Sequence, residues 1–288
     1  MILAIYGSRR QKDAVPALCA FLRHLKEEGH TVIMHTKLYN SLRDQAPEIL
    51  DCITTATDSS HFIADLAISF GGDGTFLRTA MWVGSKELPI VGVNTGHLGF
   101  LSALSIHDLP NLLEDILAGK FRIERRSLLE VLEPSLGDGF CRYALNEVAV
   151  GKVESASMIT AQVCIDSLPL ANYRADGLIV ATATGSTAYS LSVGGPIVQP
   201  TLGVCVISPV AAHSLTMRPL VADADSEISI VPTTRGTHVR LALDGRYTDV
   251  EAGTEIVIAK ASFDVLVMQL SDRTFADILK DKLLWGEQ

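Results

Sequence analysis

The five residues Gly-Gly-Asp-Gly-Thr at positions 71–75 combine backbone freedom with a carboxylate. Glycine has no side chain, so the backbone can approach a ligand closely, and amide groups at the start of a helix suit phosphate. The carboxylate of Asp73 repels phosphate, so it indicates another task, either holding a divalent cation or taking a proton from an attacking hydroxyl. The same residue types also form ordinary surface turns. The stretch lacks the ending of a P-loop and the spacing of the Rossmann glycines, so it predicts neither.

A second polar feature is the pair Asn146-Glu147, which lies in an otherwise apolar stretch predicted to be a strand over 141–150. Neighbouring side chains in a strand point to opposite faces, so at least one of the two should meet the core or a cleft. The alternative is that one of them faces solvent. An amide carries the donor and acceptor that match an adenine edge, and a carboxylate carries acceptors for ribose hydroxyls.

The densest polar run of the chain extends over 173–177, 182–190 and 192–196, and consists largely of small hydroxylated residues and glycine. Such residues supply little core volume, so they indicate hydrogen bonding and close approach to a ligand. His213 and Asp244 follow later, and each taken alone is more simply explained as a structural residue.

The elements that must position these groups differ between the two halves of the chain. In the first half, apolar runs at 2–6, 31–35, 64–70 and 89–93 predict buried strands, and helical spacing predicts helices at 14–28, 76–83 and 107–119. Strand, helix and strand in this order predict a right-handed crossover and an open α/β sheet. The glycine-bearing turn at 94–100 follows a strand, and ligands gather at the carboxyl ends of such strands, so we expect a cleft there.

The second half is rich in short stretches of Val and Ile separated by turn residues, a pattern typical of strands packed as a sandwich or sheet stack. We therefore predict an α/β domain with an open, mostly parallel sheet at 1–120, a β-rich domain at 121–270, and a C-terminal helix at 271–288 that packs back on the first domain. The strands are expected at 127–132, 141–150, 158–165, 178–181, 204–207, 227–231, 237–243 and 264–267.

The length, net charge and cysteine pattern of the chain exclude some classes of function. The chain has 288 residues and a net charge of -9, which argues against a nonspecific nucleic-acid or anionic-membrane binder. An anionic small ligand stays compatible, because local arginines and amides can invert the field in one cleft. The five cysteines never form a Cys-x-x-Cys pair and are expected to be reduced core residues. We find no signal peptide or membrane span, so we expect a cytoplasmic protein.

Together these motifs resemble the bacterial-type NAD kinase family. The glycine stretch alone is shared with diacylglycerol kinases, sphingosine kinases and phosphofructokinases. The Asn-Glu pair followed by Thr-Gly-Ser-Thr-Ala-Tyr is much more specific. The likeness extends from near the first strand to the final Leu-Trp-Gly. The matching stretches are 71–75, 94–100, 146–147, 176–177, 184–190 and 194–196.

The resemblance implies a reaction and its participants. NAD kinases phosphorylate the 2′-hydroxyl of the adenosine ribose of NAD, using ATP and a divalent metal, for which we expect magnesium. By this resemblance Asp73 would be the general base or would orient that hydroxyl, and Gly72 and Gly74 would admit the phosphates. The sequence contains no dedicated ATP fingerprint, so no ATP pocket is assigned, and no protein residue is assigned to the metal.

The resemblance also implies residues that bind NAD. Asn146 and Thr184 would contact adenine, and Glu147 would hold the nicotinamide ribose. Phe100, Ala188 and Tyr189 would enclose the adenine. Arg174 and Asp176 would come from a neighbouring subunit, so we expect a homodimer or homotetramer. Three further residues match positions near the site, namely Thr187, Ser192 and Asp244.

Two other functions were weighed against this one. A diacylglycerol-type lipid kinase would be expected to carry a basic or apolar membrane-facing patch, and the acidic balance and the Asn-Glu pair speak against it. A non-catalytic NAD(P)-binding sensor would keep the pocket, but a pure binder gains little from the Asp73 carboxylate beside phosphate.

Overall fold

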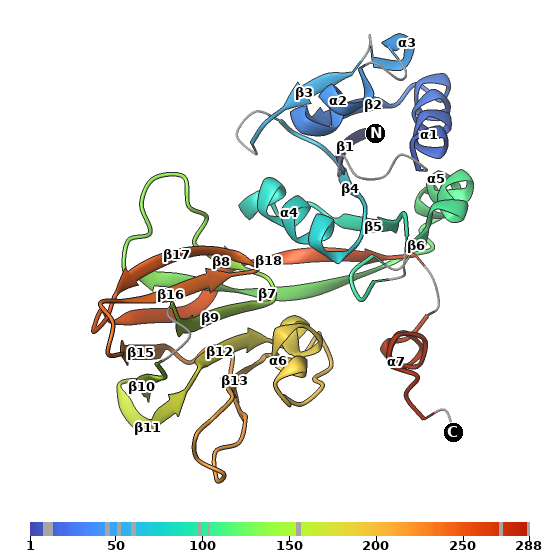
Figure 1. The fold of residues 1–288 in the computed structure, drawn as a ribbon. Coiled ribbons are helices and arrows are strands. Elements are labelled where there is room, and N and C mark those ends of the chain that lie inside the picture. Colours follow the sequence, from blue (N-terminus) through green and yellow to red (C-terminus); the bar gives the residue numbers. More distant parts are fainter. Residues whose placement is uncertain are drawn as a thin grey trace. The chain divides into compact units, whose positions relative to one another are not determined.

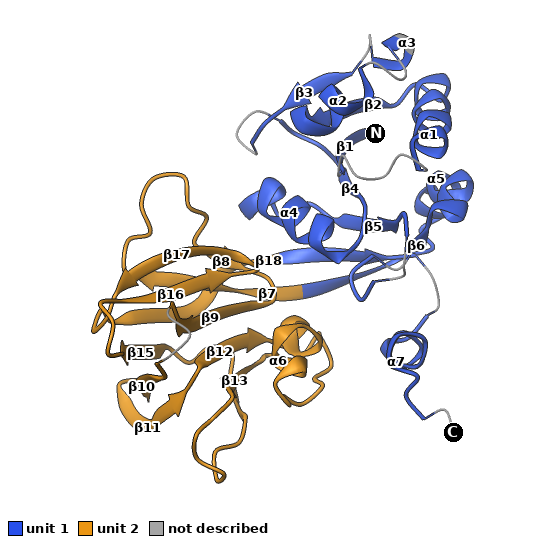
Figure 2. Cartoon of the chain, viewed as in Figure 1, with its two compact units in different colours: residues 1–125, 265–288 blue, residues 126–264 orange. Residues whose placement is uncertain are grey.

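The computed structural model describes residues 1–7, 14–43, 47–50, 53–58, 62–96, 99–102, 104–153, 157–270 and 273–286. The chain divides into two compact units (Figure 2). Unit 1 consists of Met1–Arg125 together with Val265–Gln288, and unit 2 consists of Arg126–Asp264. His97 and Leu98 of the second glycine-bearing turn, and Cys52, lie outside the described residues.

Unit 1 is built on a parallel sheet with the strand order β5-β4-β1-β2-β3 (Figure 1). Its strands are β1 (Ile2–Gly7), β2 (Thr31–His35), β3 (Thr54–Ala56), β4 (Leu66–Phe70), β5 (Ile90–Asn94) and β6 (Leu104–Ser105). The end of β18 (Ile256–Gln269) adds to this sheet through the parallel pair Val267 and Ile90. The open, mostly parallel sheet expected from the apolar runs is therefore confirmed.

Unit 1 also contains several helices. They are α1 (Val15–Glu27), α2 (Thr36–Leu42), α3 (Pro47–Leu50), α4 (Asp73–Val83), α5 (Leu109–Leu117) and α7 (Phe275–Leu283), with short 3-10 turns η3 (Gly84–Lys86) and η4 (Ile106–Asp108). Leu22 of α1 and Leu112 of α5 share one hydrophobic cluster with Leu3 of β1. The central strands β1, β4 and β5 are almost wholly buried and largely apolar, because the middle of such a sheet is covered on both faces.

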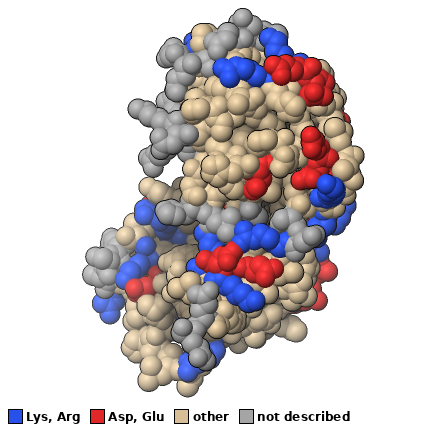
Figure 3. Space-filling view, turned by 90° about the vertical axis from the view of Figure 1, so that its right-hand side faces the viewer, with Lys and Arg blue, Asp and Glu red and all other residues tan. Residues whose placement is uncertain are grey.

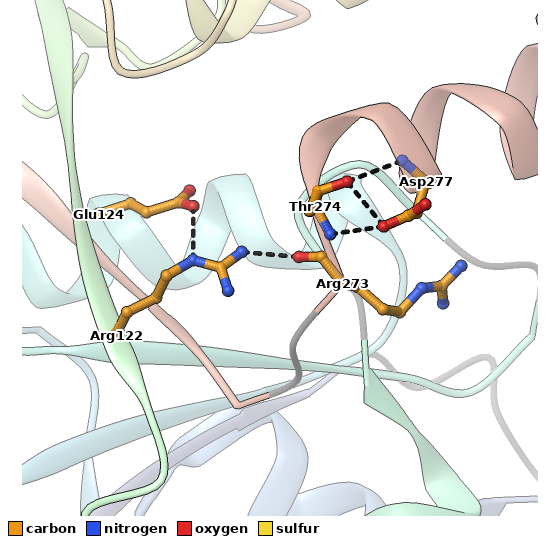
Figure 4. A network of polar contacts seen from close by, with 5 residues as sticks. All are labelled: Arg122, Glu124, Arg273, Thr274 and Asp277. Atoms are coloured by element: carbon orange, nitrogen blue, oxygen red, sulfur yellow. Dashed lines mark hydrogen bonds and ion pairs between the residues drawn. The ribbon is translucent and has the colours of Figure 1, made fainter.

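Helix α7 begins in a network of polar contacts (Figure 4). The Thr274 hydroxyl accepts the Asp277 N–H at 3.3 Å, and the Asp277 carboxylate accepts the Thr274 N–H at 2.9 Å, which is a capping box. The Arg122 guanidinium, at the start of β7 (Arg122–Glu133), donates to the Arg273 carbonyl at 2.7 Å and to Glu124 at 3.2 Å. These bonds fix where α7 begins.

Unit 2 contains an antiparallel sheet with the strand order β14-β13-β12-β9-β16-β17. Val150 and Leu178 of this sheet pack in one hydrophobic cluster with Ile159 and Ile230, which belong to a second set of strands. Two sheets packed face to face over a shared core make a sandwich, so the β-rich second half is confirmed. The first sheet comprises β9 (Glu147–Lys152), β12 (Gly177–Thr182), β13 (Val204–Val210), β14 (Leu220–Asp223), β16 (His238–Leu243) and β17 (Arg246–Glu251). The second set comprises β8 (Tyr143–Ala144), β10 (Ile159–Ile165), β11 (Leu168–Ala175), β15 (Ile228–Thr233) and the neighbouring parts of β7 and β18.

Some strands differ from the expected ones. β11, β14 and β17 lie at sheet edges and were not predicted, because they lack the buried apolar runs of the central strands. β18 begins at Ile256, whereas a strand was expected only over 264–267. In the described part of the chain, no helix is long and apolar enough to cross a membrane.

Replacing Thr274 by Ala should loosen the first turn of α7, because the Asp277 N–H loses its side-chain acceptor and the Asp277 carboxylate loses the bond from the Thr274 hydroxyl. We expect a loss of about 1 kcal/mol of local stability, seen as faster amide hydrogen exchange over 275–283. The exposed Thr201, which lies in a turn outside any helix, provides the control Thr201→Ala. Equal exchange in the two variants would show that the capping box does not hold the helix.

Candidate functional site

The glycine stretch of unit 1 places Asp73 inside a helix. β4 ends at Phe70, Gly71 has φ +152, Gly72 is the N-cap, and α4 begins at Asp73. The helix was expected to begin at Phe76, so the loop is shorter than predicted. A carboxylate in the first turn is favourable beside the positive end of the helix dipole, and this offsets the poor helix propensity of Gly74. A Cβ at Gly72 would meet nothing within 4 Å, so its surface is open to a ligand.

The Asp73 carboxylate is bound to three successive backbone N–H groups. Phe100 donates to Oδ2 at 2.8 Å, and Leu101 and Ser102 donate to Oδ1 at 3.0 and 3.2 Å. A Cβ at Gly99 would collide with the same carboxylate, so only glycine fits there. Asp73 therefore holds the turn at 99–102 against the start of α4 and fixes the position of Phe100.

The Asn146-Glu147 pair of unit 2 lies at a break between two strands. A continuous strand over 141–150 was expected, and this prediction was wrong, because β8 ends at Ala144 and β9 begins at Glu147. The carboxylate of Asp244 accepts the N–H groups of Leu145, Asn146 and Glu147 at 2.7, 2.9 and 3.1 Å. The break is thus a bend that a second aspartate holds.

Asp244 itself sits in the turn between β16 and β17. Its φ is 46 and that of Gly245 is 77, the pair of positive values that a two-residue type I′ hairpin requires. Asp-Gly is a favoured sequence for this turn. In the structure Asp244 therefore binds the backbone that presents Asn146 and Glu147.

Glu147 is a buried carboxyl with an unusual proton affinity. Its pKa is raised to about 7, mainly by burial and also by the nearby charge of Asp244, whereas the Tyr189 N–H opposes the shift. Its Oε2 has no hydrogen-bond partner among the described residues. The pKa of Asp244 is also raised by burial, against three backbone N–H bonds and the charge of Arg246. A ligand that offers hydroxyl groups could satisfy Oε2.

The 3-10 turn η5 (Thr184–Thr187) lies directly on the bend. The Thr182 hydroxyl donates to the Leu145 carbonyl at 2.6 Å and accepts the Gly185 N–H at 3.0 Å. A Cβ at Gly185 would collide with the Asn146 backbone. Thr184 is buried and accepts a bond from Arg126 at 3.3 Å. Asn146 and Thr184 are thereby brought to one place.

The helix α6 (Tyr189–Ser192) follows and completes this part of the site. The Ser190 and Ser208 hydroxyls lie 2.9 Å apart and tie α6 to β13. The Tyr189 side chain is 45% exposed, so its ring is available to a ligand. Thr187 donates to the Thr184 carbonyl at 3.3 Å. Ala188 precedes the helix as its N-cap, and Ser192 is its last residue.

Arg174 and Asp176 lie apart from this group within unit 2. Arg174 is exposed on β11, and Asp176 pairs with Lys152 at 2.9 Å. Among the described residues, neither side chain hydrogen-bonds to Asn146 or Glu147. Sequence reasoning did not single out Arg126. Thr182 and Ser190 belong to the polar run at 182–190 that was expected to approach a ligand, but neither was given a role of its own. An arginine directly before the apolar stretch expected as a strand at 127–132 was the signal that could have indicated Arg126.

No protein-built metal centre is present in the described ranges, where no three His, Cys, Asp or Glu side chains are arranged to hold an ion. Both oxygens of Asp73 are already engaged by backbone N–H groups. The residues present therefore do not form a dedicated cation site, and no chemical step is assigned to a metal.

Comparisons with known proteins show the family to which the chain is related. The ATP-NAD kinase N-terminal domain matches residues 4–121, and the ATP-NAD kinase C-terminal domain matches 145–270. The NAD kinase of Porphyromonas gingivalis is 41% identical over 287 residues, covering 99% of this chain and 98% of that protein. The NAD kinase of Bacteroides fragilis is 37% identical over 286 residues, with the same coverage.

Solved structures show the same fold. The yeast NADH kinase complexed with NADH has a TM-score of 0.87 and 24% identity, and the match covers 100% of this chain and 89% of that one. At this identity it shows the fold alone. An NAD kinase from Archaeoglobus fulgidus in complex with ATP has a TM-score of 0.74 and 26% identity, with 98% of each chain covered.

Replacing Asp244 by Asn should weaken the bend at 145–147 without forcing the turn, because Asn tolerates positive φ. We expect a loss of about 2 kcal/mol in the free energy of unfolding, since a buried N–H left without an acceptor costs about 1–3 kcal/mol. Urea denaturation gives the value. Asp249→Asn, which removes an exposed partner of Arg240, is the matched control and should change little. If both variants are equally stable, the Asp244 bonds contribute nothing.

Glu147 should make stability depend on pH. Its pKa is about 7 in the folded protein and 4.5 in the reference state, so the folded state binds the proton more tightly. The stabilisation is full below pH 4.5 and is lost as the pH rises to about 7. A difference of one pKa unit corresponds to about 1.4 kcal/mol. The protonation of Glu147 therefore contributes up to about 3 kcal/mol to the free energy of unfolding.

The test compares the wild type with Glu147→Gln by urea denaturation at pH 5 and pH 8. The free energy of unfolding of the wild type, relative to that of the variant, should decrease from pH 5 to pH 8. Glu251→Gln, at an exposed position, should show no such change. A difference between wild type and Glu147→Gln that stays constant with pH would contradict the assignment.

Proposed function

The chain belongs to the ATP-NAD kinase family, and from this premise we propose that it transfers the γ-phosphate of ATP to the 2′-hydroxyl of the adenosine ribose of NAD, giving NADP. The observation that carries the proposal is the Asp73 carboxylate, held at the first turn of α4 directly after Gly71 and Gly72. Open glycine amides at a helix start can bind phosphate, and a carboxylate of fixed orientation can act on a hydroxyl.

Phosphoryl transfer leaves little covalent work for a protein, so positioning carries most of the rate. We assign Asp73 to accept or orient the proton of the 2′-hydroxyl. Its three N–H bonds fix the direction of the carboxylate. Phe100 is fixed by the same bonds, which supports its assignment as a wall of the adenine site.

The residues around the Asn146 bend are assigned to the dinucleotide. Asn146 and Thr184 are joined through Gly185 and Thr182, which supports a common role at the adenine. Glu147 is assigned to ribose hydroxyls, because its buried Oε2 lacks a partner among the described residues. Arg174 and Asp176 are assigned to a dinucleotide bound with a second copy of the chain, in a homodimer or homotetramer.

ATP is the donor that the family indicates, and magnesium is the expected ion. Magnesium commonly keeps several waters and binds substrate phosphates with one or two carboxylates. This mode does not require the dedicated cation site that the described residues lack. The ion would neutralise phosphate charge when it is bound.

Replacing Asp73 by Asn should lower the turnover number by about 10² to 10⁴-fold, the usual range for general-base assistance. NADP formation from NAD, ATP and magnesium, coupled to an NADP-specific dehydrogenase, measures this. The variant also loses part of the hydrogen bonding that holds the turn at 99–102. A second variant is therefore needed to separate the loss of a base from the loss of this hydrogen bonding.

Gly99→Ala separates the two roles of Asp73. Its Cβ would collide with the Asp73 carboxylate, so it disturbs the contact between that carboxylate and the turn at 99–102 but keeps the carboxylate as a possible base. If Asp73 acts as a base, Asp73→Asn loses turnover far more than Gly99→Ala does. Equal losses in both variants would reduce Asp73 to a positioning residue. A wild type that binds NAD and makes no NADP would indicate a sensor.

A further inference from the structure

Arg78 lies at an exposed position of α4, and its side chain turns back toward the start of that helix. Its Nη2 donates to the Thr75 hydroxyl at 3.2 Å, and a Cβ at Gly74 would lie 3.9 Å from its Nη1. Side chains on a helix lean toward the N-terminus of the helix, so an arginine one turn further along can reach the first turn. The guanidinium group of Arg78 therefore lies beside the glycine stretch at 71–75.

The position of this guanidinium group is set by Gly71 and Thr75. A Cβ at Gly71 would collide with Thr75 Oγ1, so the glycine leaves room for the hydroxyl that accepts the bond from Arg78. Thr75 is buried, which keeps its hydroxyl in one place. One side of the guanidinium group is thus anchored to the helix, and Gly74 adds no side chain that would cover the other.

A cation at this end of a helix is electrostatically unfavourable. The N-terminus is the positive end of the helix dipole and repels positive charge. The Asp73 carboxylate accepts three N–H groups of the turn at 99–102, and it forms no ion pair with Arg78 in the part of the chain that the structure describes. The first N–H groups of α4 have no acceptor within the helix. Together the amides and the guanidinium group form a positive place that an anion would satisfy.

Arg78 also differs from other basic residues of the chain. On the face shown in Figure 3, basic and acidic side chains lie interspersed, and elsewhere in unit 1 Arg125 pairs with Glu87 at 3.1 Å. Within the described ranges, Arg78 forms no ion pair with a carboxylate. Its bond to Thr75 uses a single N–H of a group that carries several. The remaining N–H groups can therefore bind the oxygens of a ligand.

We propose that Arg78 is a further catalytic residue of the phosphoryl transfer, and that its guanidinium group binds the γ-phosphate of ATP beside the amides of Gly72 and Gly74. This inference rests on the proposed function, in which Asp73 acts on the 2′-hydroxyl of NAD. The phosphorus that this hydroxyl attacks must lie next to it. The phosphate at the start of α4 is therefore the transferred group and not the diphosphate of NAD. A guanidinium group binds two phosphate oxygens at once.

The charge of Arg78 acts on the group that is transferred. The 2′-oxygen forms a bond to the γ-phosphorus, and the bond between that phosphorus and the oxygen that bridges to the β-phosphate breaks. The bridging oxygen keeps the electron pair and leaves with ADP, and the hydroxyl proton passes to Asp73. Negative charge is spread over the oxygens of the phosphoryl group during this step. A fixed cation that touches these oxygens stabilises the transition state.

Steady-state kinetics of NADP formation with Arg78→Gln test the proposal. We expect kcat to fall by about 10²-fold or more and the KM for ATP to rise, with the KM for NAD unchanged. Arg78→Lys keeps the charge but lacks the planar fork, so it should recover part of the loss. The control Arg23→Gln removes the same charge from an exposed position of α1 and should behave as the wild type does.

Two further measurements separate this role from a structural one and from failure of the kinase reaction. The urea midpoint of Arg78→Gln should equal or exceed that of the wild type, because a cation is removed from the positive end of a helix. Isothermal titration of the full chain with a non-hydrolysable ATP analogue and magnesium should show binding weakened by about 10-fold or more in Arg78→Gln. A wild type that makes no NADP would overturn the proposed function, and the titration would still decide whether Arg78 binds the phosphate of ATP.

Three outcomes would overturn the proposal. In the first, Arg78→Gln keeps the kcat and the KM for ATP of an active wild type. In the second, only the KM for NAD rises, which would place Arg78 at the diphosphate of NAD. In the third, Arg78→Gln and Arg78→Lys lose turnover equally and both unfold at a lower urea concentration, which would make Arg78 a structural residue.

Discussion

A carboxylate that accepts three successive backbone N–H groups is the interaction on which both parts of the candidate site depend. In unit 1 Asp73 binds the amides of 100–102, and in unit 2 Asp244 binds those of 145–147. A bend that points several N–H groups in one direction is an anion-binding concavity, and an unsatisfied buried N–H costs about 1–3 kcal/mol. A distant aspartate satisfies all three groups at once. The positions of Phe100, Asn146 and Glu147 are therefore set by other residues.

The glycines near these two aspartates are required by the same interactions. We call each aspartate carboxylate, of Asp73 or Asp244, together with the three backbone N–H groups that it accepts, a clamp. At these glycines the backbone lies in contact with another backbone segment or with the aspartate carboxylate. A Cβ atom would prevent this close approach. Gly99 faces the Asp73 carboxylate, and Gly185 faces the Asn146 backbone. On the other side of the turn at 99–102, a Cβ at Gly92 would lie 2.7 Å from the Leu101 carbonyl oxygen. These glycines serve close packing, whereas Gly72 faces open space and is the one suited to a ligand.

The buried strands and the helices of this chain could be predicted from its sequence. The hydrogen bonds of Asp73 and Asp244 to distant backbone N–H groups could not. Apolar runs such as Leu66–Phe70 are recognisable because a strand buried on both faces is largely apolar along its length. Edge strands such as β17 escaped, because their alternation of polar residues resembles loop composition. The Asp244 bonds join residues 97–99 positions apart, so no local pattern contains them. For the same reason the expected strand at 141–150 proved to be broken, since the bend depends on a partner far along the chain.

The Asp244 clamp also decides the chemistry of Glu147. Burial raises the pKa of both carboxyl groups, but the two receive different compensation. Three backbone N–H bonds and Arg246 favour the charged form of Asp244, whereas Glu147 receives the single N–H of Tyr189 and faces the charge of Asp244. The pKa of Glu147 is therefore raised to about 7. Near neutral pH such a carboxyl can donate a hydrogen bond to a ligand oxygen or accept one from a hydroxyl. The same bonds that hold the bend in place thus leave Glu147 as the adaptable partner for a ligand.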